Sequence, residues 1–231
     1  MIGIIGAMEE EVAALKESMV IEEVKEIASM NFCKGKMDGK DVVVVRSGIG
    51  KVNAGICAQL LITVFGVDKV INTGIAGSLD AKIDIGDMVI STDALHHDMD
   101  AVAFGYPRGE VPRMETLSFE ADPELVKIAK EVNEEVNPMI HTFTGRVVTG
   151  DQFVSSKEVK EEIKKYFDPM CTEMEGAAIA QAAYLNKVPY VIIRAISDKA
   201  DNSATMDYPT FEKQAISHSV NLVKNLIPRI G

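Results

Sequence analysis

The sequence of 231 residues has no tryptophan and only three cysteines, Cys33, Cys57 and Cys171, which lie far apart. Because no CxxC pair and no cysteine–histidine cluster occurs, neither a disulfide framework nor a metal site is indicated. Isolated free cysteines are usually buried, so we expect three reduced thiols in the core. No apolar stretch reaches the roughly 20 residues of a membrane span, and the N-terminus lacks the pattern of a signal peptide. These absences favour a cytoplasmic protein with no membrane partner.

Positive charge is also scarce, since 24 Lys and Arg residues stand against 35 Asp and Glu residues, a net charge of −11. An acidic protein repels phosphate backbones, which argues against a nucleic-acid partner. With 47% hydrophobic and 26% charged residues, the chain is typical of a globular protein. No linker or change of composition divides it, so we expect a single domain over residues 1–231.

Short apolar runs alternate with helical patterns along the chain. We expect strands at Ile2–Gly6, Asn31–Met37, Asp41–Ser47, Lys69–Thr73, Asp87–Thr92, Thr142–Thr149 and Val188–Ile196. We expect helices at Glu9–Met19, Lys51–Phe65, Pro123–Val136, Ser156–Tyr166, Met174–Asn186 and Phe211–Ile227. This order predicts an α/β fold, a three-layer α/β/α sandwich around a mixed, largely parallel sheet. Ligands of such sheets bind beyond the carboxyl ends of the strands.

Three motifs near strand ends contain glycine or acidic residues that also have a plain structural explanation. The carboxylates of GAMEEE (6–11) suit a helix N-terminus through the helix dipole, and this turn is not the GxGxxG dinucleotide motif. The glycines of SGIGKVNA (47–54) either form a simple strand-to-helix turn or let the backbone approach an anion. NTGIAGS (72–78) is another glycine-rich turn after a strand.

Two later motifs indicate chemistry more directly. In TEMEGAA (172–178), Glu173 and Glu175 flank Met174, so carboxylate oxygens can accept hydrogen bonds from sugar hydroxyls while the thioether packs on the ring. In IIRAISDKAD (192–201), Asp198 at a strand end is placed as a general acid, provided that burial raises its pKa. The structural alternatives are a solvated helix start and a helix cap. The histidines show no metal-ligand spacing.

Together with HHDMDAVAFGY (96–106) and TGDQF (149–153), these motifs resemble the 5'-methylthioadenosine/S-adenosylhomocysteine nucleosidases of the nucleoside phosphorylase superfamily, over almost the whole chain. The resemblance implies a nucleoside phosphorylase-like fold and hydrolysis of the N-glycosidic bond of both nucleosides, and of 5'-deoxyadenosine. Adenine and a 5-substituted ribose are released, in methionine salvage and in removal of a methyl-cycle by-product. No cofactor is implied.

The resemblance also implies roles for individual residues. Asp198 protonates N7 of adenine with help from Ser197, and Glu11 activates the attacking water. Glu175 holds the ribose hydroxyls, and Arg194 supports the carboxylates near the water. The remaining substrate-binding residues are Met8, Ile49, Phe153, Val154, Glu173, Met174 and Tyr208. A homodimer is implied as well, in which the neighbouring subunit contributes Phe104, Tyr106 and Pro112.

Three alternatives stay open at this stage. A phosphorolytic relative would place an arginine in the first loop, where this chain has Glu11. A hydrolase of futalosine-type nucleosides would use the same adenine and ribose contacts. A binding protein without turnover would have no need of a water-activating carboxylate. The chain also has Ile75 where the family commonly carries serine, and Tyr208 where phenylalanine is also found.

Overall fold

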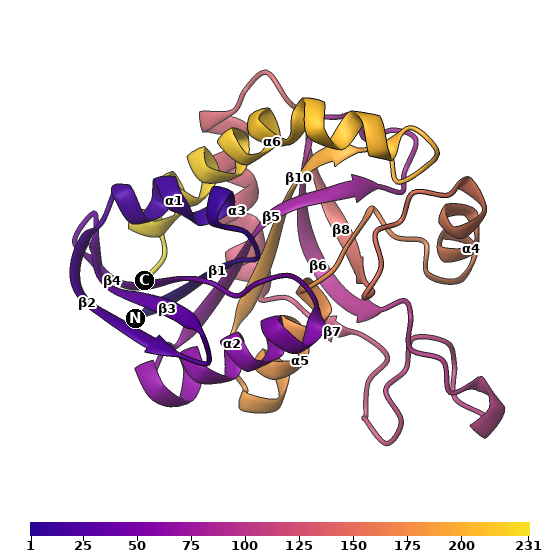
Figure 1. Cartoon of the computed structure of the whole chain (residues 1–231), viewed down its shortest axis with the longest axis horizontal. Coiled ribbons are helices and arrows are strands. Elements are labelled where there is room, and N and C mark those ends of the chain that lie inside the picture. The colour runs from indigo at the N-terminus through magenta and orange to yellow at the C-terminus, as the bar shows by residue number, and fades with distance from the viewer.

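The structure, a computed structural model, describes all 231 residues as one continuous arrangement of strands and helices (Figure 1). Ten strands join a single sheet: β1 (Ile2–Gly6), β2 (Val20–Ile27), β3 (Met30–Met37), β4 (Lys40–Arg46), β5 (Lys69–Ser78), β6 (Met88–His96), β7 (Phe119–Glu120), β8 (Thr142–Thr149), β9 (Cys171–Glu173) and β10 (Tyr190–Asp198). The helices are α1 (Glu9–Glu17), α2 (Lys51–Phe65), α3 (Pro123–Val136), α4 (Lys157–Phe167), α5 (Gly176–Asn186) and α6 (Ala204–Leu226), with short 3₁₀ turns η1 (Val102–Phe104) and η2 (Ile227–Arg229).

The sheet is mixed, as predicted. Strands β4, β1, β5 and β10 are adjacent in this order and parallel to one another, whereas β2, β3 and β4 form an antiparallel edge. Strand β10 pairs with both β5 and β6, and the path β10-β6-β8-β9-β5 therefore closes on itself like a small barrel. This closure gathers the carboxyl ends of β5 and β10 beside β9, where the motifs of the sequence lie.

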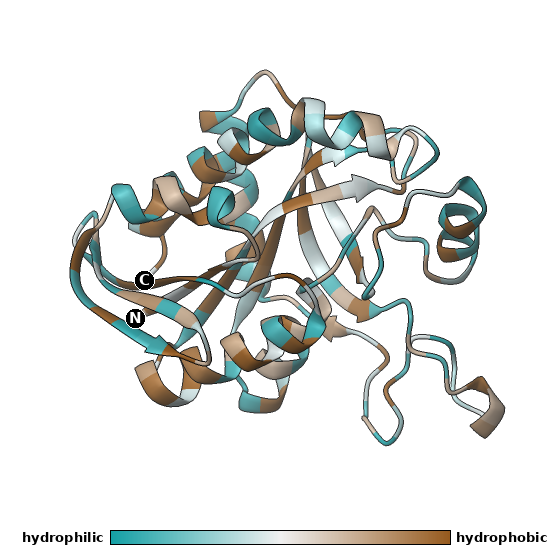
Figure 2. Ribbon diagram, viewed as in Figure 1, coloured by the Kyte–Doolittle hydropathy of each residue, from teal (hydrophilic) through white to brown (hydrophobic).

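Helices cover both faces of the sheet, which confirms the three-layer architecture. In Figure 1, α1, α3 and α6 lie on one side, and α2 and α5 pack together on the other. Each side encloses its own apolar cluster against the strands, and a smaller third cluster lies under α4. Figure 2 shows that the inner strands are mostly hydrophobic, whereas β2 and α4 carry hydrophilic stretches.

Local sequence signals explain several elements. The Asp38-Gly39 turn has positive φ at both residues and joins β3 to β4, as expected for a tight hairpin. The run Val42–Val45 is fully buried, in agreement with a strand covered on both faces. The three cysteines are free and buried, as predicted. None of the helices has the length and apolarity of a membrane-spanning segment.

The structure corrects four expectations. Strand β2 (Val20–Ile27) was not predicted, because its residues are nearly all exposed and no buried face gives it a pattern. The segment 72–78 is not a turn, since β5 continues to Ser78. Helix α5 begins at Gly176 and leaves Met174 outside it. Helix α6 begins at Ala204, before the predicted start at Phe211, and contains Pro209.

Candidate active site

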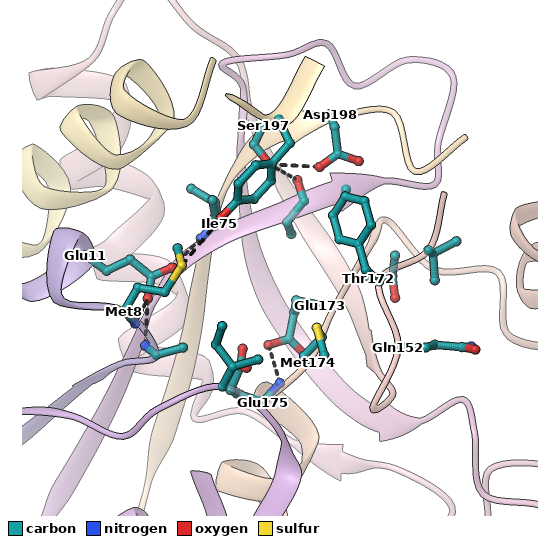
Figure 3. A pocket seen from close by; sticks show the side chains of 17 residues that line it. Met8, Glu11, Ile75, Gln152, Thr172, Glu173, Met174, Glu175, Ser197 and Asp198 are labelled. Carbon is teal, nitrogen blue, oxygen red and sulfur yellow. Dashed lines mark hydrogen bonds between the residues drawn. The ribbon is translucent and has the colours of Figure 1, made fainter. Parts of the chain in front are cut away.

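A pocket of about 350 Å³ opens beyond the carboxyl ends of β1, β5 and β10 (Figure 3). Its wall also includes the loop after β4, the loop after β8, the β9–α5 junction and the first turns of α6. The lining residues are Ala7, Met8, Glu11, Ile49, Ile75, Ala76, Gly77, Gln152, Phe153, Val154, Thr172, Glu173, Met174, Glu175, Ser197, Asp198 and Tyr208. The position agrees with the rule for open α/β sheets.

The structure brings together nearly all the predicted site residues of one chain. Every one of them lines the pocket except Arg194, which lies behind the wall and is fully buried. Phe104, Tyr106 and Pro112 are absent from the lining of this pocket. They belong to the segment between β6 and β7, which projects from the body of the molecule in Figure 1.

Glu11 is the only inward-facing member of the three carboxylates that open α1. Its neighbours Glu9 and Glu10 are exposed, whereas Glu11 is buried. Its Oε2 accepts hydrogen bonds from the backbone N–H groups of Ala7 (2.6 Å) and Met8 (3.0 Å). Burial raises the pKa of Glu11, and the positive charge of Arg194 together with the backbone hydrogen bonds opposes this shift. The helix start therefore explains only part of the role of this residue.

A close approach at β5 brings Glu11 and Arg194 together. A Cβ atom added to Gly74 would lie 2.6 Å from both Arg194 Nη1 and Glu11 Oε1. A side chain at this position would displace one of the two charged groups. The N–H of the next residue, Ile75, donates to Glu11 Oε1 at 3.3 Å. The NTG glycine is thus part of the site, although in sequence it is typical of a turn.

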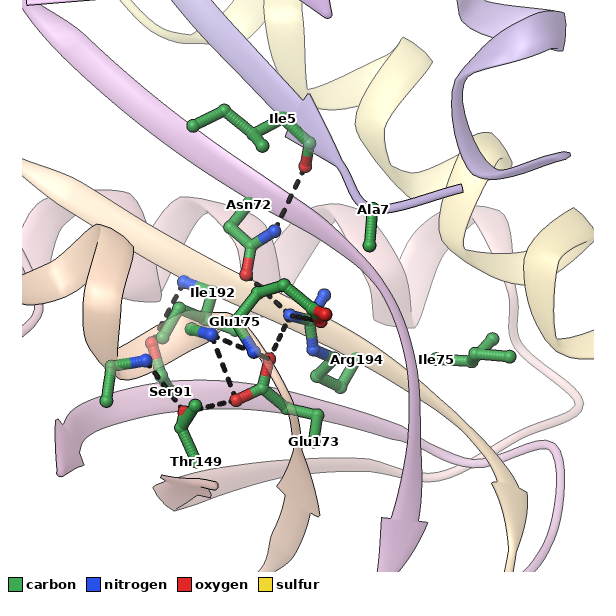
Figure 4. Close-up of polar contacts among 12 residues, drawn as sticks. Ile5, Ala7, Asn72, Ile75, Ser91, Thr149, Glu173, Glu175, Ile192 and Arg194 are labelled. Atoms are coloured by element: carbon green, nitrogen blue, oxygen red, sulfur yellow. Dashed lines mark hydrogen bonds and ion pairs between the residues drawn. The ribbon is translucent and has the colours of Figure 1, made fainter. Parts of the chain in front are cut away.

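Arg194 joins a buried network of carboxylates (Figure 4). Its Nη2 donates to Asn72 Oδ1 at 2.6 Å and to Glu173 Oε2, and it lies 3.9 Å from Glu175 Oε2. Burial opposes its charge, and the carboxylates of Glu173, Glu175 and Glu11 outweigh that effect and raise the pKa of Arg194. The single guanidinium of Arg194 therefore provides the counter-charge for three buried carboxylates.

Backbone donors hold the two glutamates of the β9–α5 junction. Glu173 accepts from the N–H groups of Glu175 (Oε2, 3.1 Å) and Gly176 (Oε2, 2.7 Å), and from the Thr149 hydroxyl. Glu175 accepts from Gly50 N–H at 2.9 Å. Burial, and next the charge of Glu173, raise the pKa of Glu175. Both oxygens of Glu173 accept hydrogen bonds from fixed donors, so Glu173 positions the wall. Only Oε1 of Glu175 accepts a hydrogen bond.

Asp198 lies on another side of the pocket, away from Glu11 (Figure 3). Its Oδ1 accepts from Ala200 N–H at 2.8 Å, and its Oδ2 accepts from the Ser197 hydroxyl at 2.9 Å. Burial is the main cause that raises the pKa of Asp198, and Asp198 forms no salt bridge with a cation. A Cβ atom added to Gly77 would lie 2.7 Å from Asp198 Oδ1. The carboxyl group is not a helix cap, because the N-cap residue of α6 is Ser203.

Two aromatic side chains meet at the pocket. The rings of Phe153 and Tyr208 lie 5.8 Å apart and nearly perpendicular. Phe153 is 47% exposed, so it is not a core residue. A half-exposed ring that lines a pocket is suited to stacking on a flat ligand.

The sequence analysis did not assign six of the lining residues: Ala7, Ile75, Ala76, Gly77, Gln152 and Thr172. Ile75 had been noted only as a departure from the family pattern. Most of these residues are small or apolar and carry no chemical signal of their own. The glycines of NTGIAGS were the available hint, because β5 passes directly beside both Glu11 and Asp198.

The fold and the pocket define an α/β enzyme that holds buried carboxyl groups in two distinct environments beside an apolar, aromatic-lined cavity. The chain belongs to the phosphorylase superfamily, whose model matches residues 1–228. The family resemblance inferred from the motifs is confirmed.

Relatives and solved structures are similar over nearly the full length. The chain is 46% identical over 228 residues to the 5'-methylthioadenosine/S-adenosylhomocysteine nucleosidase of Staphylococcus carnosus, covering 98% of this chain and 99% of that one. The nucleosidase of Colwellia psychrerythraea, solved in complex with adenine, gives a TM-score of 0.94 at 41% identity, covering 99% and 94% of the two chains. A futalosine hydrolase of Helicobacter pylori gives 0.93 at 35% identity, covering 99% and 97%.

Proposed function

We propose that this protein is an N-glycosyl hydrolase that cleaves 5'-methylthioadenosine and S-adenosylhomocysteine, and also 5'-deoxyadenosine, to adenine and the 5-substituted ribose. One observation carries the proposal: Glu11 and Asp198 are buried on different sides of one pocket, the first near a guanidinium and the second without a cation. Relatives described as nucleosidases of the first two nucleosides, at 41–46% identity over nearly the whole chain, support it.

Asp198 acts on the leaving base. Cleavage of the glycosidic bond places negative charge on adenine, and a proton delivered to N7 stabilises this charge. A carboxyl group that is buried without a cation keeps its proton to higher pH than an ordinary aspartate. Ser197 fixes its orientation through the hydrogen bond to Oδ2. Phe153 stacks on the purine, and the backbone of Val154 contacts its edge.

Glu11 and its neighbours act on the sugar. The ribose becomes cationic as the bond breaks, so the carboxylates of the Arg194 network stabilise it. Glu11 accepts a proton from the attacking water, while Glu175 binds the 2'- and 3'-hydroxyls and Met174 packs on the ring. Direct attack by water inverts the anomeric centre, as in inverting glycosidases. Met8, Ile49 and Tyr208 surround the 5'-substituent.

Charge disfavours phosphate as the nucleophile. Arg194, the cation of the buried network, is already bonded to Glu173 and Asn72. A phosphate dianion at the sugar would therefore face three carboxylates, and at low dielectric this repulsion costs on the order of several kcal/mol. The alternative of a futalosine-type nucleoside has support in the similar Helicobacter pylori structure. Such a substrate would use the same ribose contacts and carry a different 5'-substituent.

The test is release of adenine from 5'-methylthioadenosine, followed by chromatography in phosphate-free buffer and with added phosphate. We expect adenine and free 5-methylthioribose at equal rates in both buffers. Release that requires phosphate and gives the sugar 1-phosphate would contradict hydrolysis. Release from futalosine alone would move the proposal to the alternative substrate, and no release from any adenine nucleoside would favour a binding protein.

We also propose that residues 1–231 form one catalytic domain, which functions in the cytoplasm as a homodimer. Apolar side chains on the α2–α5 side support the dimer, because Val52 is 72% exposed and Leu185 is also exposed. Phe104, at the tip of the projecting segment, is 85% exposed. In the dimer, Phe104, Tyr106 and Pro112 of each subunit complete the pocket of the other.

Mass measurement in solution by light scattering tests the dimer, and complementation tests the shared site. Glu11→Gln subunits have an inactive pocket but an intact projecting segment, and Phe104→Ala subunits have the reverse. Mixed dimers should recover activity in one of the two pockets. Two inactive homodimers that stay inactive after subunit exchange would argue against a shared site.

A further inference from the structure

Tyr208 connects the pocket to a carboxylate that has no role in the reaction described above. Its hydroxyl lies 3.0 Å from Glu212 Oε1 and 3.4 Å from Met8 Sδ. Tyr208 and Glu212 stand four residues apart in α6, so they share one face of the helix. Because Tyr208 and Met8 both line the pocket, this hydroxyl lies where the 5'-substituent of the proposed substrate is expected.

The direction in which the Tyr208 hydroxyl donates its proton determines whether it acts as a hydrogen-bond donor or acceptor toward a ligand in the pocket. A carboxylate is a much better acceptor than a thioether, so the proton is directed to Glu212 and not to Met8. Burial, and next the hydrogen bond with Glu212, raise the pKa of Tyr208, and the hydroxyl stays protonated. Its oxygen then presents lone pairs to the pocket, and this part of the wall accepts a hydrogen-bond donor.

The surrounding charges favour a cationic donor. Glu212 makes its one side-chain hydrogen bond to Tyr208 and has no salt-bridge partner. Glu10 adds a second negative charge that acts on Tyr208. The nearby Glu9 is neutralised by Lys16 at 2.8 Å. This side of the pocket therefore combines an acceptor oxygen with unpaired carboxylates, which is the environment that an ammonium group requires.

We propose that Tyr208 and Glu212 recognise the ammonium group of the homocysteine side chain and so raise the preference for S-adenosylhomocysteine over 5'-methylthioadenosine. The inference rests on the proposed function and names residues that set specificity within it. The methylthio group has no donor, so it gains nothing from this pair. The homocysteine carboxylate, which the acidic wall repels, is left in solvent.

The experiment compares kcat/KM for the two nucleosides in Glu212→Gln and Tyr208→Phe. We expect the ratio of S-adenosylhomocysteine to 5'-methylthioadenosine to fall roughly tenfold in each variant, the size of one charge-assisted hydrogen bond. The double variant should lose no more than the larger single loss, because the two residues act as a unit. For an analogue of S-adenosylhomocysteine without the amino group, the ratio of its kcat/KM to that of 5'-methylthioadenosine should be the same in the variants as in the wild type.

Glu10→Gln is the comparison variant, since it removes a nearby exposed carboxylate that has no hydrogen bond to Tyr208; its ratio should fall less than in Glu212→Gln. The inference is overturned if the ratio is unchanged in both test variants, if the analogue loses as much as the parent nucleoside, or if Glu10→Gln has the same effect. Hydrolysis of 5'-methylthioadenosine by the unchanged protein tests the proposed function separately.

Discussion

The two sides of the pocket surround their carboxyl groups with different charges and hydrogen-bond donors. At the base side, Asp198 has two neutral donors, a serine hydroxyl and a backbone N–H, and no cation. At the sugar side, Glu11, Glu173 and Glu175 surround Arg194, and backbone N–H groups contact all three carboxylates. Both sides are buried. The difference lies in whether the local charges favour the protonated or the ionised form.

This contrast assigns an acid and a base to chemically similar groups. Burial alone would raise the pKa of every carboxyl group in the pocket. Arg194 opposes that effect for Glu11, although burial still raises the pKa of Glu11, whereas Asp198 has no salt-bridge partner and its pKa is raised mainly by burial. Environment, and not residue type, therefore separates the two roles, as it does in other enzymes with paired carboxylates.

Removal of the acid should have the largest effect. We expect Asp198→Asn to lower kcat for 5'-methylthioadenosine by roughly three orders of magnitude, because the amide cannot deliver a proton to N7. A nitrophenyl riboside, whose leaving group needs no proton, should keep most of its rate. Parallel steady-state assays measure both. Equal losses on the two substrates would contradict the acid role of Asp198.

Removal of the base should have a slightly smaller effect. We expect Glu11→Gln to lower kcat by about two orders of magnitude while substrate binding is retained, since the Gln side chain keeps the size of Glu. Calorimetric titration with a non-cleavable adenosine analogue measures the affinity. Weakened binding with an unchanged rate at saturation would show that Glu11 holds the substrate and does not activate water.

Loss of the shared cation should destabilise the fold. Arg194→Met leaves Glu173 and its neighbours buried without a counter-charge, and we expect a loss of about 3–5 kcal/mol in the free energy of unfolding. Urea denaturation measures it. Arg146→Met is the control, because the Arg146–Asp93 ion pair is partly exposed and should contribute less. Equal losses in the two variants would mean that the buried network stabilises the fold no more than the partly exposed Arg146–Asp93 pair.

The smallest effect concerns stability and pH. The pKa of Asp198 in the folded protein lies above its ordinary value of 3.8, so the folded state holds a proton that the unfolded chain has released. The stability contribution of this group is full below the unfolded pKa and is lost as the pH rises through the folded pKa. The free energy of unfolding of Asp198→Asn, relative to that of the wild type, should therefore increase as the pH rises from 4 to 8. Denaturation curves at both pH values measure this difference, and a gain that is larger at pH 4 would contradict the raised pKa.

The sequence predicted the catalytic region better than its surroundings. Glu11, Glu175 and Asp198 follow or end strands, and the geometry of parallel sheets brings such residues to one edge. Their motifs also matched a family over the whole chain, which single features could not have done. These residues have charged or titratable side chains, so the residue types in the sequence already indicate their chemistry.

The errors have a different physical origin. In β5, Gly74 and Gly77 looked like turn residues, but they are required because Glu11, Arg194 and Asp198 pass within contact distance of the strand. Strand β2 has no buried face, so its sequence lacks the alternation of apolar and polar residues that would predict a strand. Spatial neighbours from distant parts of the chain determine both features, and a local pattern does not contain them.

The pH dependence of kcat/KM for two substrates tests the contrast between the two sides of the pocket most directly. For 5'-methylthioadenosine we expect a bell-shaped profile, with an acidic limb from protonation of Glu11 and an alkaline limb from loss of the Asp198 proton. For the nitrophenyl riboside the alkaline limb should disappear and the acidic limb should remain. An alkaline limb that is the same for both substrates would contradict the assignment of Asp198 as the acid and Glu11 as the base.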